Sequence, residues 1–352
     1  MATYYTSSTA LGGGVGSYVD PFTLQEGLNN VASGDELRVL NDGTYSPSST
    51  LTYSLEPTDF VTISGRNSAD TAYEHATIDG TFLSGSDMLQ MSGTTYNGNR
   101  TYWKNLIFTN STVIVRGSFY GRQNWMINCQ FINSQYAWHS NGYQNTFVNC
   151  EFANLSANAL HVANESVVIG CSFHDISANA MRLCNGAKVY NSVFYDVSGD
   201  AIYGSIYTIS GCTFFRNSID ACHGAFIVVD NIFSDSGGYG IDGSYISYLY
   251  SNNLFYNNTL GDANLTAGGQ GTGLNSITGQ DPLFTNTTAG SVDLSLQTGS
   301  PAIGAGFVGT IPGNNSSIDM VGYSDIGALQ SQASTGGTSY TPAASAKFTR
   351  LE

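Results

Sequence analysis

The segment Val-Ile-Gly-Cys-Ser-Phe at residues 168–173 returns 21 residues later as Val-Tyr-Asn-Ser-Val-Phe at residues 189–194. The same frame extends over eight phenylalanines, whose spacings run from 19 to 23 residues and average 21. These are Phe108, Phe131, Phe152, Phe173, Phe194, Phe214, Phe233 and Phe255. A fixed period of this length indicates a chain built from stacked structural repeats.

The positions around each phenylalanine repeat as well. Four of the six cysteines stand two residues before a phenylalanine: Cys129, Cys150, Cys171 and Cys212. Since side chains alternate along a strand, the cysteines and phenylalanines point to the same side. A residue suited to turns, such as Asn133, Asn154 or Asp175, stands two residues after most of the phenylalanines. Each period therefore predicts two or three short β segments joined by turns.

The period predicts an all-β solenoid. No helical stripe of apolar residues persists through the repeat, and the Leu-x-x-Leu-x-Leu signature of leucine-rich repeats is absent. The remaining architecture is a single-stranded parallel β-helix of ~21 residues per coil, whose coils bury their inner faces against one another about 4.8 Å apart.

Composition excludes several classes of protein. Apolar residues make up 41% and aromatic residues 12% of the 352 residues, which is too much core-forming material for a disordered chain. The net charge of -15 argues against nucleic acid and anionic membranes as partners. No stretch approaches the roughly 18–20 apolar residues that span a bilayer, and residues 1–20 carry no secretion signal as written.

The cysteines suggest where the chain folds. No Cys-x-x-Cys pair occurs, which argues against a zinc ribbon or a thioredoxin-type motif. The repeated cysteines are expected to be free, buried thiols, because in-register side chains on adjacent coils have poor geometry for a disulfide. Unpaired buried cysteines are typical of a protein that folds in a reducing cytosol.

Two flanking regions support the repeat. The opening region runs from Pro21-Phe22-Thr23-Leu24-Gln25 to Gly43-Thr44-Tyr45. The closing motifs are Asp281-Pro282-Leu283-Phe284, Ser300-Pro301-Ala302-Ile303 and Asp325-Ile326-Gly327-Ala328. Together with the coils, they make residues 20–330 resemble right-handed parallel β-helix proteins of the pectate-lyase-like superfamily, of the tail-spike or polysaccharide-lyase type. Gly304 departs from the aspartate common in that family.

The resemblance implies a right-handed solenoid whose first coil is capped by a short N-terminal helix. It divides the chain into an N-terminal arm at residues 1–20, a β-helix at residues 21–330 with irregular C-terminal coils, and a tail at residues 331–352. The tail is rich in Ser, Thr and Gly and predicts a flexible linker or a docking peptide.

Stacking turns a repeated sequence position into a row of side chains along the solenoid. Nine residues after the phenylalanine, on the outer side of the strand, stand His161, Arg182, Tyr203, His223 and Asp242. His139 joins this row if its coil is one residue shorter. Six residues after the phenylalanine stand Asn158, Asn179, Asp200, Asp220 and Tyr239.

These rows predict a glycan-binding groove, with His139, Asn158, Asn179 and Tyr239 as binding residues. They also hold the groups for β-elimination of a uronate: Arg182 or His161 to neutralise the carboxylate, a His or Tyr to take the proton, and Tyr203 to protonate the leaving oxygen. The alternative to binding and catalysis is an exposed strand face whose mixed polar residues are only solvated.

The acidic residues suggest a second chemistry, glycoside hydrolysis by paired carboxylates. Carboxylates on adjacent coils, such as Asp200 and Asp220, would lie about 5 Å apart, near the separation for retaining glycoside hydrolysis, whereas one skipped coil gives roughly 9.6 Å, near the inverting range. Asp200 with Asp242, or Asp220 with Asp242, are variants of the same idea. The competing interpretation, which we favour, is that Asp200 and Asp220 cap turns as Asn158 and Asn179 do. No cofactor or metal is predicted; Ca²⁺ would suit paired carboxylates, but no Asp-x-Asp-x-Asp loop supports it.

Three functional hypotheses remain. The first is a phage-type virion or tail protein, made in the host cytoplasm and commonly trimeric in this family, that recognises a cell-surface polysaccharide, with cleavage left open. The second is a polysaccharide lyase or glycoside hydrolase acting on acidic glycans, extracellular after removal of a signal peptide. The third is a structural or decorating virion rod without catalysis. The fold by itself does not decide between them.

Overall fold

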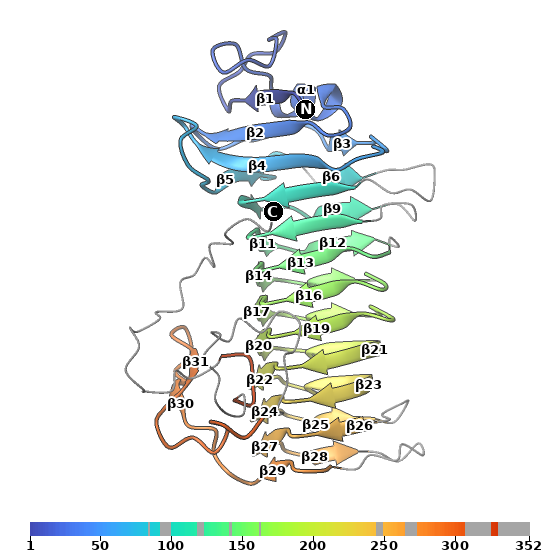
Figure 1. Cartoon of the computed structure of the whole chain (residues 1–352), viewed down its shortest axis with the longest axis vertical. Coiled ribbons are helices and arrows are strands. Elements are labelled where there is room, and N and C mark those ends of the chain that lie inside the picture. Colours follow the sequence, from blue (N-terminus) through green and yellow to red (C-terminus); the bar gives the residue numbers. More distant parts are fainter. Residues whose placement is uncertain are drawn as a thin grey trace.

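The computed structural model shows a single parallel β-solenoid of about 10 turns with about 22 residues per turn (Figure 1). It describes residues 1–83, 85–91, 100–117, 123–140, 143–161, 163–243, 249–264, 273–306 and 325–329. The predicted fold class is therefore confirmed. The predicted tail at residues 331–352 lies outside the described residues.

Each coil contributes strands to three faces, which we name A, B and C in chain order. Face A is formed by β2 (Glu36–Asn41), β4 (Val61–Asn67), β7 (Thr101–Lys104), β10 (Asn124–Ile127), β13 (Thr146–Val148), β16 (Val167–Ile169), β19 (Lys188–Tyr190), the second halves of β21 (Ile202–Ser210) and β23 (Cys222–Val229), and β26 (Leu249–Ser251).

Face B follows and carries the phenylalanine frame. It is formed by β5 (Ala76–Asp79), β8 (Leu106–Thr109), β11 (Gln130–Ser134), β14 (Glu151–Leu155), β17 (Ser172–Ile176), β20 (Val193–Val197), β22 (Thr213–Phe215), β24 (Ile232–Ser234), β27 (Leu254–Tyr256) and β29 (Ile277–Thr278).

Face C completes the coil. It is formed by β3 (Leu51–Tyr53), β6 (Asp87–Met91), β9 (Val113–Gly117), β12 (Tyr136–Ser140), β15 (Leu160–His161), β18 (Met181–Arg182), the first halves of β21 and β23, β25 (Tyr239–Asp242) and β28 (Gly261–Asn264). Because β21 and β23 run from face C into face A, these two faces form one continuous sheet.

A column of stacked phenylalanine rings fills the interior behind face B. The eight frame phenylalanines are at most 1% exposed. Consecutive ring centroids lie 4.5–5.4 Å apart with interplanar angles of 3–13°. Since each coil adds one ring over the last, the column links the coils through aromatic stacking as well as buried area.

All six cysteines are free and buried, as the repeat predicts for four of them. The Sγ–H of Cys150 donates to the carbonyl of Met126 at 3.3 Å, a contact that reaches across to the preceding coil. Burial raises the pKa of Cys212 to about 12. Cys212 is therefore a protonated filler of the core rather than a reactive group.

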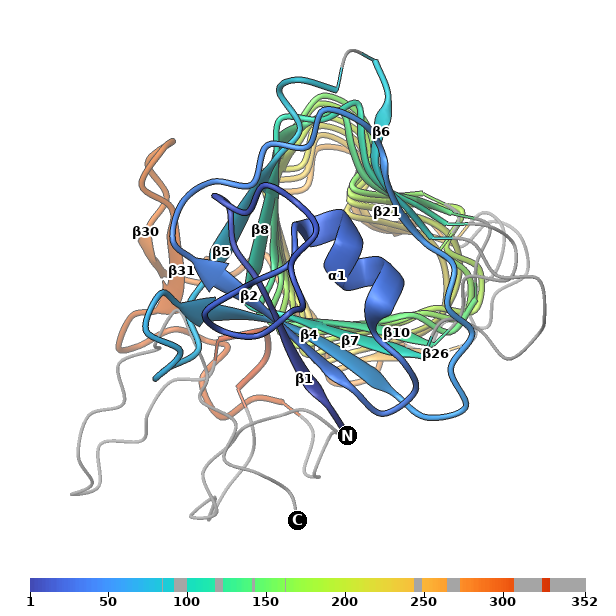
Figure 2. The ribbon, with the colours of Figure 1, turned by 90° about the horizontal axis from the view of Figure 1, so that it is seen from above.

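A short helix closes the N-terminal end, as predicted. Helix α1 (Leu24–Asn30) begins at a capping box in which Thr23 and Glu26 satisfy each other's backbone N–H groups. It buries Leu24 and Leu28 over the first coil, and the end-on view places it across the solenoid interior (Figure 2). The arm at residues 1–20 contains β1 (Thr3–Thr6), which pairs in parallel with β2 and so extends face A.

The closing motifs pack outside the coils. The antiparallel pair β30 (Phe284–Asn286) and β31 (Asp293–Leu296) lies beyond face B (Figure 2). Their apolar side chains join a second core whose solenoid members are Phe215, Ile232 and Leu254. Gly327 reaches the same surface at a φ of +103°, where an added Cβ would lie 2.7 Å from Ile232. The described residues of the closing region therefore pack on the last coils of face B.

No helix in the described parts of the chain has both the length and the apolar character that crossing a bilayer requires.

The phenylalanine column predicts a large, local cost of truncation. Phe173 lies 4.5 Å from Phe152 and 4.7 Å from Phe194, so Phe173→Ala should destabilise the protein by about 3–5 kcal/mol through lost burial and a cavity. The matched control is Phe82→Ala, at a side chain that is 70% exposed. Urea unfolding followed by circular dichroism measures both variants; equal midpoints for the two would contradict the assigned core.

Candidate functional site

A row of nine polar side chains runs along the outer surface of face C, one from each of nine successive described coils. We call it the polar ladder. Its members are paired in register from strand to strand: Gln90, Arg116, His139, His161, Arg182, Tyr203, His223, Asp242 and Asn264.

The alignment predicted from the repeat is found in the structure. His161, Arg182, Tyr203, His223 and Asp242 occupy consecutive rungs. His139 pairs with His161, as the shorter coil required.

Three members of the polar ladder were not predicted from the sequence. Asn264 follows Phe255 by the same nine residues as the others, and Arg116 follows Phe108 by the eight residues that separate His139 from Phe131. These shared offsets could have predicted Asn264 and Arg116 as members of the ladder. Gln90 precedes the first frame phenylalanine, so only the pairing of β6 with β9 places it.

The first half of the ladder combines aromatic rings with cations. The rings of His139 and His161 lie 4.5 Å apart, and Tyr136 on the same strand lies 5.2 Å from His139 and 6.2 Å from His161. Arg116 binds Asp87, whereas Arg182 is exposed and forms no ion pair with the described residues. The result is a cluster of three rings, tilted against one another, beside an exposed guanidinium.

The two histidines of this half are held neutral. Burial lowers the pKa of His161 below its ordinary value, and the neighbouring His139 and Arg182 lower it further by charge repulsion. Burial and Arg116 lower the pKa of His139 in the same way. The Nδ1 of His161 is buried and has no hydrogen-bond partner among the described residues. A neutral imidazole next to a cation is suited to accept a proton.

The second half of the ladder is acidic. The Tyr203 and His223 rings lie 4.8 Å apart, and the Nδ1 of His223 lies 3.4 Å from Asp242 Oδ2 and 3.8 Å from Asp220 Oδ2. Asp220 first, and then Asp242 and Asp200, raise the pKa of His223, although partial burial opposes them. The first half of the ladder therefore holds histidines with lowered pKa values, and the second half holds one, His223, with a raised pKa.

The inner row of predicted residues forms a ladder of turns. Asn158 Oδ1 accepts the N–H of Asn179 at 3.1 Å, Asp200 Oδ1 accepts that of Asp220 at 3.1 Å, and Asp220 Oδ1 accepts that of Tyr239 at 2.6 Å. Each side chain thus satisfies a backbone donor of the next coil. This supports the turn interpretation favoured from the sequence, and Asn158, which is 4% exposed, is too buried to be the glycan-binding residue that the sequence predicted.

Two carboxylates and one imidazole also form a candidate metal-binding cluster. Asp200, Asp220 and His223 can each offer one ligand atom within 4.8 Å of the others. Backbone bonds occupy only one oxygen of each carboxylate, and burial raises the pKa of Asp200.

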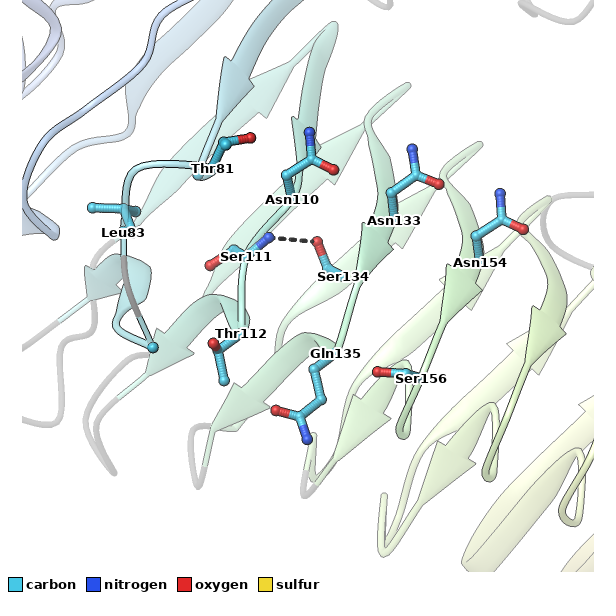
Figure 3. Close-up of a pocket in the computed structure, with 12 residues that line it drawn as sticks. Thr81, Leu83, Asn110, Ser111, Thr112, Asn133, Ser134, Gln135, Asn154 and Ser156 are labelled. Atoms are coloured by element: carbon cyan, nitrogen blue, oxygen red, sulfur yellow. Dashed lines mark hydrogen bonds between the residues drawn. The ribbon is translucent and has the colours of Figure 1, made fainter.

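A hollow separate from the polar ladder lies at the turn between faces B and C (Figure 3). It has a volume of about 620 Å³ and is lined by amides and hydroxyls, including Asn110, Asn133 and Asn154 on successive coils. Ser111 N–H donates to Ser134 Oγ across it at 3.1 Å. Gln135 links this hollow to Tyr136 beside the ladder. Because no titratable side chain lines it, it can bind a polar ligand but not supply acid or base.

Comparison with known proteins supports the fold. Residues 118–260 match the family described as "Right handed beta helix region". No curated protein matches the sequence.

Solved structures with the same architecture include three lyases. The pectate lyase Pel9A superposes with a TM-score of 0.64 at 15% identity, covering 94% of this chain and 97% of that one. A rhamnogalacturonan lyase gives 0.60 at 13% identity, covering 82% and 91%. The alginate lyase of Paenibacillus sp. str. FPU-7 gives 0.50 at 13% identity, covering 79% and 99%.

At these identities the likeness establishes the architecture and leaves the chemistry to the residues of this chain. The chain is a right-handed parallel β-helix protein with the fold that pectate lyase and other polysaccharide lyases adopt.

Proposed function

We propose that this protein recognises an acidic polysaccharide along the polar ladder and cleaves it by β-elimination. The observation that carries the proposal is the consecutive placement of His161, Arg182 and Tyr203 on adjacent strands of one open face. Strand spacing sets the rungs about 4.8 Å apart, close to the length of one sugar unit.

The three residues match the three tasks of the reaction. The exposed Arg182 guanidinium neutralises the uronate carboxylate, which stabilises negative charge developing at C5. The neutral His161 imidazole takes the C5 proton. The electron pair of the C5–H bond becomes the C4–C5 double bond, the C4–O bond breaks, and the Tyr203 hydroxyl gives its proton to the leaving oxygen.

The surroundings favour a polyanion at the first half of the ladder. Arg116 and Arg182 lie on the rungs that flank the two histidines, and Arg116 is bound to Asp87, so Arg182 supplies the positive charge that no carboxylate among the described residues offsets. Tyr136 adds an aromatic surface on which a sugar ring can stack. The protein as a whole is acidic, so this local reversal of charge would direct an anionic chain to these rungs.

A glycoside hydrolase is the second candidate. It rests on Asp200, whose pKa is raised by burial and by the nearby Asp220, as a general acid requires. Its weakness is that both carboxylates already hold a backbone N–H of the next coil.

We propose a virus particle as the setting, with the chain folding in the host cytoplasm and acting on a cell-surface glycan. The support is that all six cysteines are buried and free, which suits a reducing compartment. An extracellular enzyme is the alternative setting.

The elimination proposal predicts which variants lose cleavage. On a panel of uronate and neutral polysaccharides, the protein should release products with the ultraviolet absorbance of an unsaturated uronate. His161→Ala should lower turnover by about 10²–10⁴-fold because the base is lost. Arg182→Ala should lower both affinity and turnover.

The matched control is Lys188→Ala, an exposed cation one strand further along the same coil, on face A. It should leave cleavage unchanged, and all three variants should unfold at nearly the same temperature. New reducing ends without unsaturation would identify the hydrolase instead. Neither binding nor product on the whole panel would favour the structural rod.

The displaced pKa values can be measured without substrate. In a proton NMR titration of the histidine ring resonances, His161 should titrate below the ordinary pH of about 6.5 and His223 above it. His139→Gln should raise the pKa of His161, because it removes a ring that becomes positively charged over the same acidic pH range. The opposite order of His161 and His223 would exclude His161 as the base.

The virion setting predicts assembly. Light scattering coupled to size-exclusion chromatography should give the mass of a homotrimer. A monomer at micromolar concentration would argue for the extracellular enzyme.

A further inference from the structure

The acidic half of the ladder gathers four metal-ligating groups from successive coils. Asp200 and Asp220 come from the turns before β21 and β23, His223 from β23, and Asp242 from β25. The elimination chemistry proposed above uses none of these four side chains. Three of the side chains stay partly accessible, with exposed fractions of 17% for His223, 11% for Asp220 and 13% for Asp242, whereas Asp200 is buried.

The spacing at His223 differs from that of an ordinary histidine–carboxylate contact. Its Nδ1 lies 3.4 Å from Asp242 Oδ2 and 3.8 Å from Asp220 Oδ2, both longer than a normal hydrogen bond of about 2.7–3.2 Å. His174 on face B provides the internal comparison. Its two ring nitrogens lie 2.8 Å from Asp175 and 3.2 Å from Glu151, within hydrogen-bond range.

The longer spacing fits ligands arranged around a cation. Nitrogen and oxygen ligands bound at about 2.1 Å in a tetrahedral site lie roughly 3.4 Å from one another. The Nδ1 of His223 and Asp242 Oδ2 already stand at 3.4 Å, and Asp220 Oδ2 is 0.4 Å further out. Small side-chain rotations would bring the cluster, now within 4.8 Å, to this geometry.

Backbone hydrogen bonds hold the carboxylates in place. Asp200 Oδ1 accepts from the N–H of Asp220, and Asp220 Oδ1 from the N–H of Tyr239, so each carboxylate is oriented by the next coil. Support of this kind from outside the first ligand sphere fixes metal ligands before the ion arrives. Within the described ranges, Asp200 Oδ2 receives a single 3.3 Å bond, from the Asn179 amide, and Asp220 Oδ2 points toward His223.

We propose that Asp200, Asp220 and His223, with Asp242 beside them, form a binding site for one divalent transition-metal cation of the Zn²⁺ or Mn²⁺ type. An imidazole among the ligands favours such ions, whereas Ca²⁺ takes six to eight oxygen ligands. The partial exposure leaves coordination positions for water or a glycan oxygen. This cation site goes beyond the proposed function, because its ligands and its binding test do not depend on a glycan substrate.

The test uses the full chain after dialysis against a chelator. Isothermal titration with ZnCl₂, MnCl₂ and CaCl₂, together with elemental analysis of the dialysed complex, should show one Zn²⁺ or Mn²⁺ per chain and weaker binding of Ca²⁺. Asp220→Asn and His223→Ala should each weaken binding by at least about tenfold. Asp220→Asn keeps an oxygen for the Tyr239 N–H, so it preserves the turn.

His161→Ala is the matched control, since it removes an imidazole from the same ladder without a carboxylate neighbour, and it should bind the ion as the unmodified protein does. The proposal is overturned if neither Zn²⁺ nor Mn²⁺ binds, if Ca²⁺ binds more tightly than both, or if the Asp220 and His223 variants bind normally. Glycan cleavage is assayed separately, so loss of metal binding with intact cleavage would refute this site alone.

Discussion

The in-register hydrogen bonding of each coil to the next is the constraint on which the rest of this structure depends. Parallel strands leave no freedom to slide by one residue, because such a slip would exchange every buried side chain for an exposed one. Phe152, Phe173 and Phe194 therefore fall directly over one another, with ring centroids 4.5–4.7 Å apart. The buried column and the outer rows are two consequences of one register.

The same register places residues of unlike charge and protonation state on neighbouring coils of face C. Side chains on the outer surface of face C meet their neighbours at strand spacing whether or not their charges agree. His139 beside His161, with Arg182 next, produces a neutral, proton-accepting group, whereas His223 among three carboxylates is pushed toward its charged form. The electrostatic division of the ladder into two halves thus follows from the order of coils and requires no loop or domain to build it.

The closing region shows how one face is selected for ligands. Its apolar side chains cover Phe215, Ile232 and Leu254 on the last coils of face B, while the polar ladder on face C is partly exposed, most of all at Gln90 and Arg182. The amide-lined hollow at the turn between faces B and C adjoins that row through Gln135. An elongated polar ligand would find a continuous surface there, whereas face B presents a partly covered sheet. This separation of covered and open faces gives the acidic glycan proposal its location.

The sequence alone determined the solenoid, the phenylalanine column, the buried cysteines and the succession from His139 to Asp242, because a period of about 21 residues converts sequence spacing into spatial alignment. The repeat did not predict burial of Cys184 and Cys222, because neither stands two residues before a frame phenylalanine, yet both are buried. Only the tertiary structure decided that Asp200 and Asp220 hold turns, that Arg182 is exposed without an ion pair among the described residues, and that the closing motifs cover face B. These outcomes depend on burial and on contacts between coils at variable offsets, which spacing along the chain does not encode.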